Sequence, residues 1–505
     1  MLRRRKEFVS VASLATLALF AAGCTTTSGG NGGGGEDGVS EVTFAPGAFP
    51  QALDAQYYPT ELAVFNISHQ VMDTLVMFED GEAIPALAES WENPDENTWV
   101  FQLRETTFSD GTDFTAEDAK ASLERILELD GPIAPLFAKV DEITADDDRT
   151  LTITTSSPLG NLANSLSMVF IGQADKVDDD DYWTQPIGTG PFTVENYTAD
   201  DRIELVRNDD YWGDTPELER VTVVNMPEVS SRITALQSGE IDVTTDIPPD
   251  QVSGVEDIDD ATFTTDDSYK YLVTWFNHEN EALDDTRVRQ ALTHAVDLDS
   301  LLDSLYGDSA SPMHGPLNAA VFGAPALEDH PYDPDKAREL LADAGYEDGL
   351  SFEMIWPNDA APNVRSFAQG IISDWEEIGV EIEPFELERA QWTDRFDGKD
   401  YDLSLFENVT TTGDAGFTLG RLYTCDADRM GYCDEELDEF LQNGEESVDQ
   451  GERETSYEEA SQILWQDAVS YWLAELNNSI AYKDHLSGIE IQPTGLVDFS
   501  KVSTS

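Results

Sequence analysis

Two of the three cysteines, Cys425 and Cys433, stand eight positions apart in the acidic stretch LYTCDADRMGYCDEELD. Thiols at a short spacing can form a redox pair, bind a metal or form a disulfide. A redox pair is usually C-x-x-C, and a structural zinc site needs two further Cys or His ligands nearby, which this stretch lacks. We therefore favour a disulfide that closes a short loop, with two free buried thiols as the alternative.

The rest of the chain offers little that could do chemistry. It contains no G-x-S-x-G, no H-E-x-x-H, no G-x-x-x-x-G-K-[ST] and no G-x-G-x-x-G that opens a helix. No two of the six histidines are four or fewer positions apart, and neighbouring carboxylates are too common here to be informative. We therefore predict a binding protein with no catalytic residues, no metal site and no cofactor.

The first 40 residues predict export and anchoring. A basic start, MLRRRKEF, precedes an apolar run of signal-peptide length that ends in Ala-Ala-Gly-Cys24. This ending resembles a lipobox, in which residues 1–23 are removed and Cys24 is lipidated. Arg4 and Arg5 also resemble a twin-arginine signal, so the export route stays open. Residues 24–40 are rich in Gly and Ser and predict a flexible tether; in an exported protein a disulfide persists.

The charge of the chain is strongly negative. It has 102 Asp and Glu against 28 Lys and Arg, a net charge of −74, and the acids are scattered along the chain. Such a surface repels itself at low ionic strength and is screened by salt, so we interpret it as a surface adapted to high salt. A dedicated acidic site for cations or basic partners is the alternative. Nucleic acid is not expected as a partner, because no basic stripe exists to neutralise phosphates.

Helix and strand patterns alternate along the chain and predict an α/β protein. The stretch NTWVFQLRETTFSDG predicts two short strands with a turn at Asp110-Gly111. The next stretch, FTAEDAKASLERIL, predicts a helix with Thr115 as N-cap and Asp118 three residues later. DPDKARELLADAGY predicts another helix, with Asp333 as its N-cap.

Several stretches together resemble the extracellular solute-binding proteins of ABC importers, family 5, which include binders of dipeptides, oligopeptides, glutathione and nickel. They are ALAESWENPDENTWVFQLRETTFSDGTDFTAEDAKASLERI, IGTGPF, RNDDYWGDTPELERV, RITALQSGEIDV and DDTRVRQALTHAVD. The resemblance runs from about Glu41 to the C-terminus. We regard the residues of these stretches, Gly188 and Gly190 among them, as residues that build the fold and do not touch a ligand.

The resemblance implies a periplasmic-binding-protein-like fold with two α/β lobes joined by two strand crossovers. Lobe I would comprise residues 41–277 plus 475–505, with an inserted subdomain at about 60–185, and lobe II would comprise residues 278–474. The crossovers would be YLVTWFN and LAELNNSIAYKD. A ligand would be enclosed between the lobes by hinge closure.

The resemblance also implies candidate ligand-binding residues. A peptide needs a carboxylate for its ammonium and a cation for its carboxylate, because unpaired buried charges are unfavourable. Asp414 in TTTGDAGFTLGRLYTCD matches the Asp that receives the amino group, and Arg365 in APNVRSFAQGI matches an Arg that meets the ligand carboxylate. The alternatives are a turn residue for Asp414 and a helix-surface ion pair for Arg365. Trp356, Trp392 and Tyr57 are candidate walls of the site, with the protein core as the alternative.

The function implied is that of a monomeric, extracytoplasmic substrate-binding lipoprotein, anchored to the outer face of the cell membrane through Cys24. It would capture a small peptide or peptide-like solute and deliver it to the permease of an ABC transporter, without catalysis. One alternative is the same fold with a non-peptide ligand such as a nickel chelate, an oligosaccharide or haem. Another is a surface hydrolase.

Overall fold

The computed structural model describes residues 40–79, 81–129, 131–179, 181–328 and 330–504. The predicted signal peptide, the lipidation site Cys24 and the tether up to residue 39 lie outside these residues. Within them, no helix combines the length and the apolar character that crossing a membrane requires.

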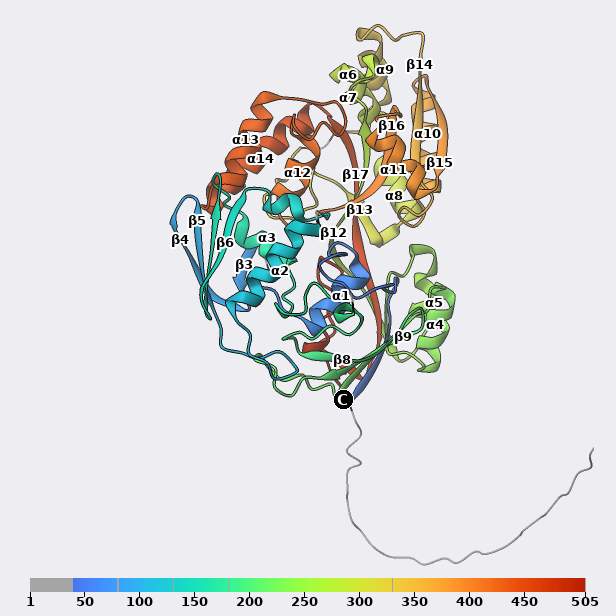
Figure 1. Ribbon diagram of the computed structural model, residues 1–505. Coiled ribbons are helices and arrows are strands. Elements are labelled where there is room, and N and C mark those ends of the chain that lie inside the picture. Colours follow the sequence, from blue (N-terminus) through green and yellow to red (C-terminus); the bar gives the residue numbers. More distant parts are fainter. Residues whose placement is uncertain (1–39, 80, 130, 180, 329, 505) are drawn as a thin grey trace, which may run out of the picture. The chain divides into compact units, whose positions relative to one another are not determined.

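One eleven-stranded sheet runs through the structure (Figure 1). Its strand order is β15-β14-β16-β12-β17-β11-β1-β10-β9-β8, and β13 also pairs with β17. The strands are β1 (Glu41–Ala45), β8 (Phe192–Thr198), β9 (Arg202–Arg207), β10 (Arg220–Val224), β11 (Val243–Thr245), β12 (Ala261–Phe276), β13 (Ala310–Pro312), β14 (Leu350–Pro357), β15 (Val380–Leu387), β16 (Leu403–Val409) and β17 (Ser470–Lys483).

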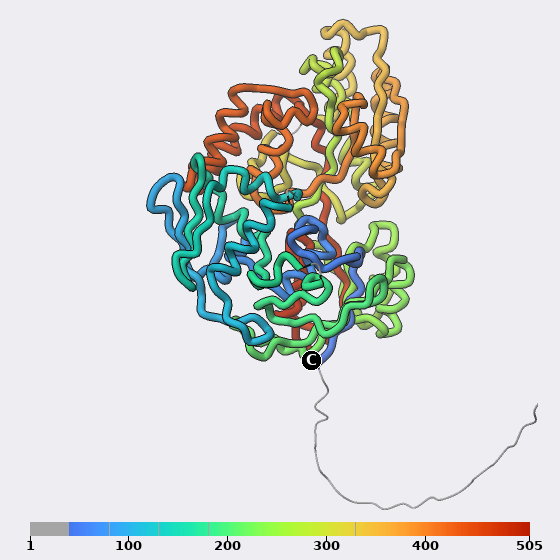
Figure 2. Tube along the Cα trace, viewed as in Figure 1, coloured from blue at the N-terminus to red at the C-terminus, as the bar shows by residue number. Residues whose placement is uncertain are grey.

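The two long strands of this sheet, β12 and β17, pair antiparallel along almost their whole length. The first half of β12 pairs with residues 478–483, beside β11, and its second half pairs with residues 470–476, beside β16. The register shifts between Asp266 and Lys270. In the sheet, β11 lies between β17 and β1, and Figure 2 shows the red segment of β17 close to the blue segment of β1. The two expected crossover stretches fall on these strands, whereas the lobe boundaries at residues 277/278 and 474/475 stay predictions.

Smaller sheets flank the main one. A four-stranded sheet has the order β4-β5-β7-β6, and the other two are hairpin-like pairs, β2-β3 and β18-β19. Their strands are β2 (Val76–Glu79), β3 (Glu82–Pro85), β4 (Ala88–Asp95), β5 (Thr98–Leu103), β6 (Val140–Asp147), β7 (Thr150–Thr155), β18 (Leu486–Ser487) and β19 (Ser503–Thr504). The second strand expected before Asp110-Gly111 is reduced to one bridge, Thr107 with Asp113, because the turn leaves too few residues to pair.

Helices cover both faces of the half-sheet formed by β14, β15, β16 and the second half of β12. The helices on one face pack on Leu272 and Phe276, and the helices on the other face pack on Tyr271 and Trp275. The helices of the structure are α1 (Leu62–Val71), α2 (Ala116–Leu129), α3 (Leu162–Ser165), α4 (Val229–Ser238), α5 (Val252–Glu256), α6 (Glu281–Asp284), α7 (Thr286–His294), α8 (Leu298–Leu305), α9 (Pro334–Asp343), α10 (Val364–Glu377), α11 (Arg389–Asp397), α12 (Ala415–Tyr423), α13 (Glu435–Glu446) and α14 (Gln450–Gln466).

The local signals in the sequence are confirmed at several helix ends and turns. The backbone N–H of Thr115 donates to Asp118 Oδ2 at 2.8 Å, which completes the expected cap of α2. Asp333 accepts from the N–H of Lys336 at the start of α9. Gly188 and Gly190 are needed for a close backbone approach, since a Cβ on Gly188 would lie 2.0 Å from the carbonyl oxygen of Val71.

Candidate ligand-binding site

Two groups of parallel strands end toward each other in the main sheet. β1, β10 and β11 are parallel, and β11 pairs antiparallel with the part of β17 that lies beside the first half of β12. β14, β15 and β16 are parallel, and β16 pairs antiparallel with the second half of β12. The carboxyl ends of both groups therefore point to the middle of β12. Ligands of open α/β sheets bind outside the carboxyl ends of strands, so we place the candidate site there.

Three helices begin just after the strands of the second group. α10 follows β14, α11 follows β15 and α12 follows β16. The N-terminal end of a helix carries a partial positive charge, which favours anionic and polar ligand groups. Four of the five predicted ligand-binding residues lie on these strands, on these helices or at the start of a helix.

Asp414 is the N-cap of α12 and is almost fully buried. Its Oδ1 accepts from the N–H of Gly416 at 2.9 Å. Its Oδ2 accepts from Arg453 Nη2 at 2.6 Å and from Asn164 Nδ2 at 2.9 Å. The carboxylate thus joins α12, α14 and α3, and a ligand ammonium at this position would have to displace one of the two side-chain donors.

Arg365 lies in the first turn of α10, and 65% of its side chain is exposed. Its guanidinium forms an ion pair with Glu386 at the end of β15. The arginine is therefore at a strand end, as the candidate site requires, but it already has a carboxylate partner. A ligand carboxylate here would compete with Glu386.

The three aromatic candidates differ in exposure. Trp392 is buried, stacks on Phe406 with ring centroids 4.4 Å apart, and donates from Nε1 to Ser404 Oγ. Trp356 is also buried, and its indole N–H has no hydrogen-bond partner among the described residues. Tyr57 is 52% exposed. A buried indole N–H without a partner can be satisfied by a bound polar group, which keeps Trp356 a candidate.

Sequence reasoning missed a group of charges at the middle of β12. Lys270 Nζ lies 3.4 Å from Oδ1 of Asp246, the residue that directly follows β11. Burial lowers the pKa of Lys270, but the nearby carboxylates Asp246 and Glu407 offset this effect and leave the pKa raised. Burial raises the pKa of Glu407, and the neighbouring Lys270 lowers it in part. A lone charge in each apolar strand, as in YKYLVTWF and LSLFENV, is the signal that could have found them.

The structure also has two hollows that lie away from the predicted ligand-binding residues. A hollow of about 970 Å³ lies between the β4–β5 turn and the α13–α14 connection, and one of about 700 Å³ is lined by Arg104, Arg149 and Trp212. The five predicted ligand-binding residues line neither hollow. The described part of the chain contains no cluster of three or more His, Cys, Asp or Glu that could hold a metal ion.

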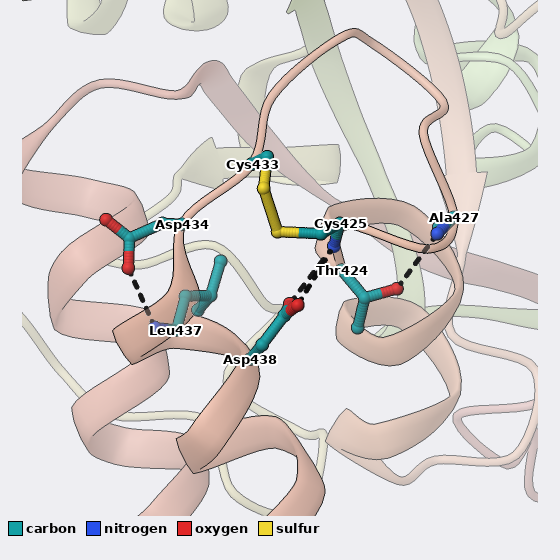
Figure 3. Close-up of a disulfide and its surroundings, with 7 residues drawn as sticks. All are labelled: Thr424, Cys425, Ala427, Cys433, Asp434, Leu437 and Asp438. Atoms are coloured by element: carbon teal, nitrogen blue, oxygen red, sulfur yellow. Dashed lines mark hydrogen bonds between the residues drawn. A yellow bond between two sulfur atoms is a disulfide. The ribbon is translucent and has the colours of Figure 1, made fainter.

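The cysteine pair forms the predicted disulfide, Cys425–Cys433 (Figure 3). The loop that it closes connects the end of α12 to the start of α13. Asp438 accepts from the N–H of Cys425 at 3.1 Å, and Asp434 caps α13 by accepting from the N–H of Leu437 at 2.9 Å. The disulfide therefore fixes the position of α12, whose first residue follows Asp414.

Residues 82–429 match the family described as bacterial extracellular solute-binding proteins, family 5. The chain belongs to this family. Di/tripeptide-binding protein 2 of Pseudomonas aeruginosa is 26% identical, over 90% of this chain and 93% of the relative. Heme-binding protein A of Haemophilus influenzae is 28% identical, over 86% and 87% of the two chains.

Solved structures of substrate-binding proteins share the fold. A substrate-binding protein of an ABC transporter, CtaP of Listeria monocytogenes, matches with a TM-score of 0.84, at 23% identity, over 92% of this chain and 99% of that one. The periplasmic binding protein DppA of Helicobacter pylori, solved with the peptide STSA, matches with a TM-score of 0.76 at 24% identity, over 92% and 98% of the chains. The fold is thus the two-lobed fold of periplasmic binding proteins. Family 5 consists of solute-binding proteins, which are not enzymes, and its members work outside the cytoplasm with ABC permeases.

Replacing Arg453 by Met should destabilise the protein by about 3–5 kcal/mol, because it leaves the buried carboxylate of Asp414 without its cation. The free energy of unfolding, measured by chemical denaturation in high salt, checks this. Arg338→Met is the matched control: its pair with Asp335 is exposed, and the change should stay within about 0.5 kcal/mol. Equal effects of the two substitutions would contradict the structural role of the Asp414–Arg453 pair.

The double substitution Cys425→Ser, Cys433→Ser should lower the free energy of unfolding by roughly 2–3 kcal/mol, since the disulfide closes a short loop in the unfolded chain. Denaturation of the oxidised wild type, the reduced wild type and the double variant provides the comparison. Reduction should lower the free energy of unfolding of the wild type by about as much as the double substitution does. It should not change the free energy of unfolding of the double variant. No difference between oxidised and reduced wild type would contradict the prediction.

Proposed function

We propose that this protein is the lipid-anchored, extracytoplasmic substrate-binding protein of an ABC transporter, and that it captures a small peptide or peptide-like solute for the permease. The observation that carries the proposal is the meeting of two groups of strand carboxyl ends at the middle of β12, in a chain of family 5. Relatives that bind di- and tripeptides support a peptide ligand. The protein acts without catalysis, as a monomer, and Cys24 carries the lipid.

Within this proposal, Asp414 receives the ammonium of the solute and Arg365 its carboxylate. The ammonium takes the place of the Asn164 amide on Asp414 Oδ2, which exchanges a neutral donor for a charged one. Trp356, Trp392 and Tyr57 contact the apolar parts of the solute. The ammonium and the carboxylate of the solute then each have a partner of opposite charge on lobe II.

Closure is supported by contacts between segments far apart in the sequence. Lys139 Nζ lies 2.8 Å from Glu445 Oε2, and the N–H of Gly160 donates to the carbonyl of Glu445 at 2.7 Å. In the proposed division into lobes, these bonds join the inserted subdomain of lobe I to α13 of lobe II. A solute that touches both lobes only when they are closed shifts the population toward that state.

Titration calorimetry in high salt tests the proposed ligand class. The panel contains dipeptides, tripeptides, an oligosaccharide, haem and a nickel–histidine complex, since relatives include heme-binding and nickel-binding proteins. We expect heat from at least one di- or tripeptide and none from the other compounds. Binding of a sugar, haem or the nickel complex with no response to any peptide would contradict the proposal.

Gly160→Ala should weaken peptide binding at least about tenfold without lowering the free energy of unfolding. A Cβ at this position would lie 1.7 Å from the carbonyl oxygen of Ser447, so the methyl group blocks the closed state but not the fold of either lobe. Gly131→Ala is the control, because nothing lies within 4 Å of its Cβ position. The comparison uses the tightest peptide of the panel. Unchanged affinity of the Gly160 variant would show that these contacts do not form in the bound state.

A further inference from the structure

Arg421 stands out among the cations of this chain. Every other Lys and Arg of the described residues has a carboxylate within 4.0 Å or donates a hydrogen bond, whereas Arg421 has neither. With 102 acids for 28 basic residues, a guanidinium that has neither an acidic partner nor a hydrogen bond is unusual in this chain.

The guanidinium lies against the protein and still meets solvent. The side chain of Arg421 is exposed, its Cζ is 4.8 Å from the ring centroid of Phe417, and its charge acts on the hydroxyl of the fully buried Tyr271. Desolvation lowers the pKa of Arg421, which would not happen to a side chain that extends freely into water. The group is therefore partly desolvated but remains open to a ligand.

The position of Arg421 connects it to the candidate site. It lies on α12, the helix that Asp414 caps, and the positive charge of Arg429 contributes to the lowered pKa of Arg421. Arg429 is paired with Asp397 and lies over the ring of Phe396, which in turn stacks on Trp392. Arg429 thus lies one ring away from Trp392, an aromatic residue that the proposed function assigns to the solute.

We propose that Arg421 binds a carboxylate of the transported solute. This inference rests on the proposed function. A partly desolvated guanidinium gains most from a carboxylate, which can accept two parallel hydrogen bonds from it. A role in stabilising the carbonyl end of α12 is the simpler alternative, since a cation in the last turn of a helix is favourable. That role predicts an effect on stability and none on ligand choice.

The test combines a change in the protein with a change in the ligand. The probes are three peptides. Ala-Glu has both a side-chain and a terminal carboxylate, Ala-Gln lacks the side-chain carboxylate, and Ala-Glu with an amidated C-terminus lacks the terminal one. The proteins are wild type, Arg421→Gln, Arg421→Lys and the control Arg338→Gln on α9. Calorimetry in high salt gives the affinities, and denaturation gives the stability of each variant.

We expect that removal of one of the two carboxylates from the peptide lowers the affinity of the wild type at least about tenfold. The same removal should change the affinity of Arg421→Gln less than about twofold. Arg421→Lys should retain part of the preference, and Arg338→Gln all of it. If Arg421→Gln leaves both preferences intact, or wild type shows neither, the inference is wrong while peptide binding stands. If no peptide binds to wild type, the proposed function fails and the inference fails with it. Should Arg421→Gln not fold, the Arg421→Lys preferences decide: values equal to wild type for both carboxylates overturn the inference.

Discussion

The antiparallel pairing of β12 with β17 is the interaction on which the rest of the structure depends. Each strand passes from one group of parallel strands to the other, so the two halves of the main sheet share one ladder of backbone hydrogen bonds. The irregular register between Asp266 and Lys270 lies where the two halves meet. Because the parallel strands pair on either side of this point and run toward it, the place where a ligand can bind follows from the pairing alone.

The scarcity of positive charge is the second constraint. Arg232 and Arg289 are buried and donate to backbone carbonyls at the ends of helices and strands. Arg453 neutralises the buried Asp414. In a chain with so few cations these uses leave little to spare, and an exposed arginine with neither an ion pair nor a hydrogen bond among the described residues points to a requirement outside the fold. The proposed role of Arg421 satisfies that requirement.

Local features of the fold could be predicted from the sequence because they depend on neighbouring residues. The cap of α2 by Thr115 and Asp118, the start of α9 at Asp333 and the Cys425–Cys433 disulfide belong to this kind. The two crossover strands were identified through the family resemblance, since their apolar stretches alone do not reveal their partners. The family itself was also identified from ordered short stretches and is confirmed.

The details of the site depend on long-range contacts and could not be predicted. Asp414 was expected to be open to a ligand, but its partners come from 39 and 250 positions away. Arg365 finds Glu386 only because β14 and β15 pair in parallel. Whether these residues hold the solute stays a proposal, and the lone charges Lys270 and Glu407 were overlooked because the strands around them are otherwise apolar.

The most direct test of the account is the identity of the solute that the protein carries. Protein purified without unfolding in high salt is denatured, and the released small molecules are identified by mass spectrometry. The account predicts a peptide or peptide-like compound that bears at least one free carboxylate. Release of haem, a nickel chelate or a neutral sugar in amounts equal to the protein would contradict it.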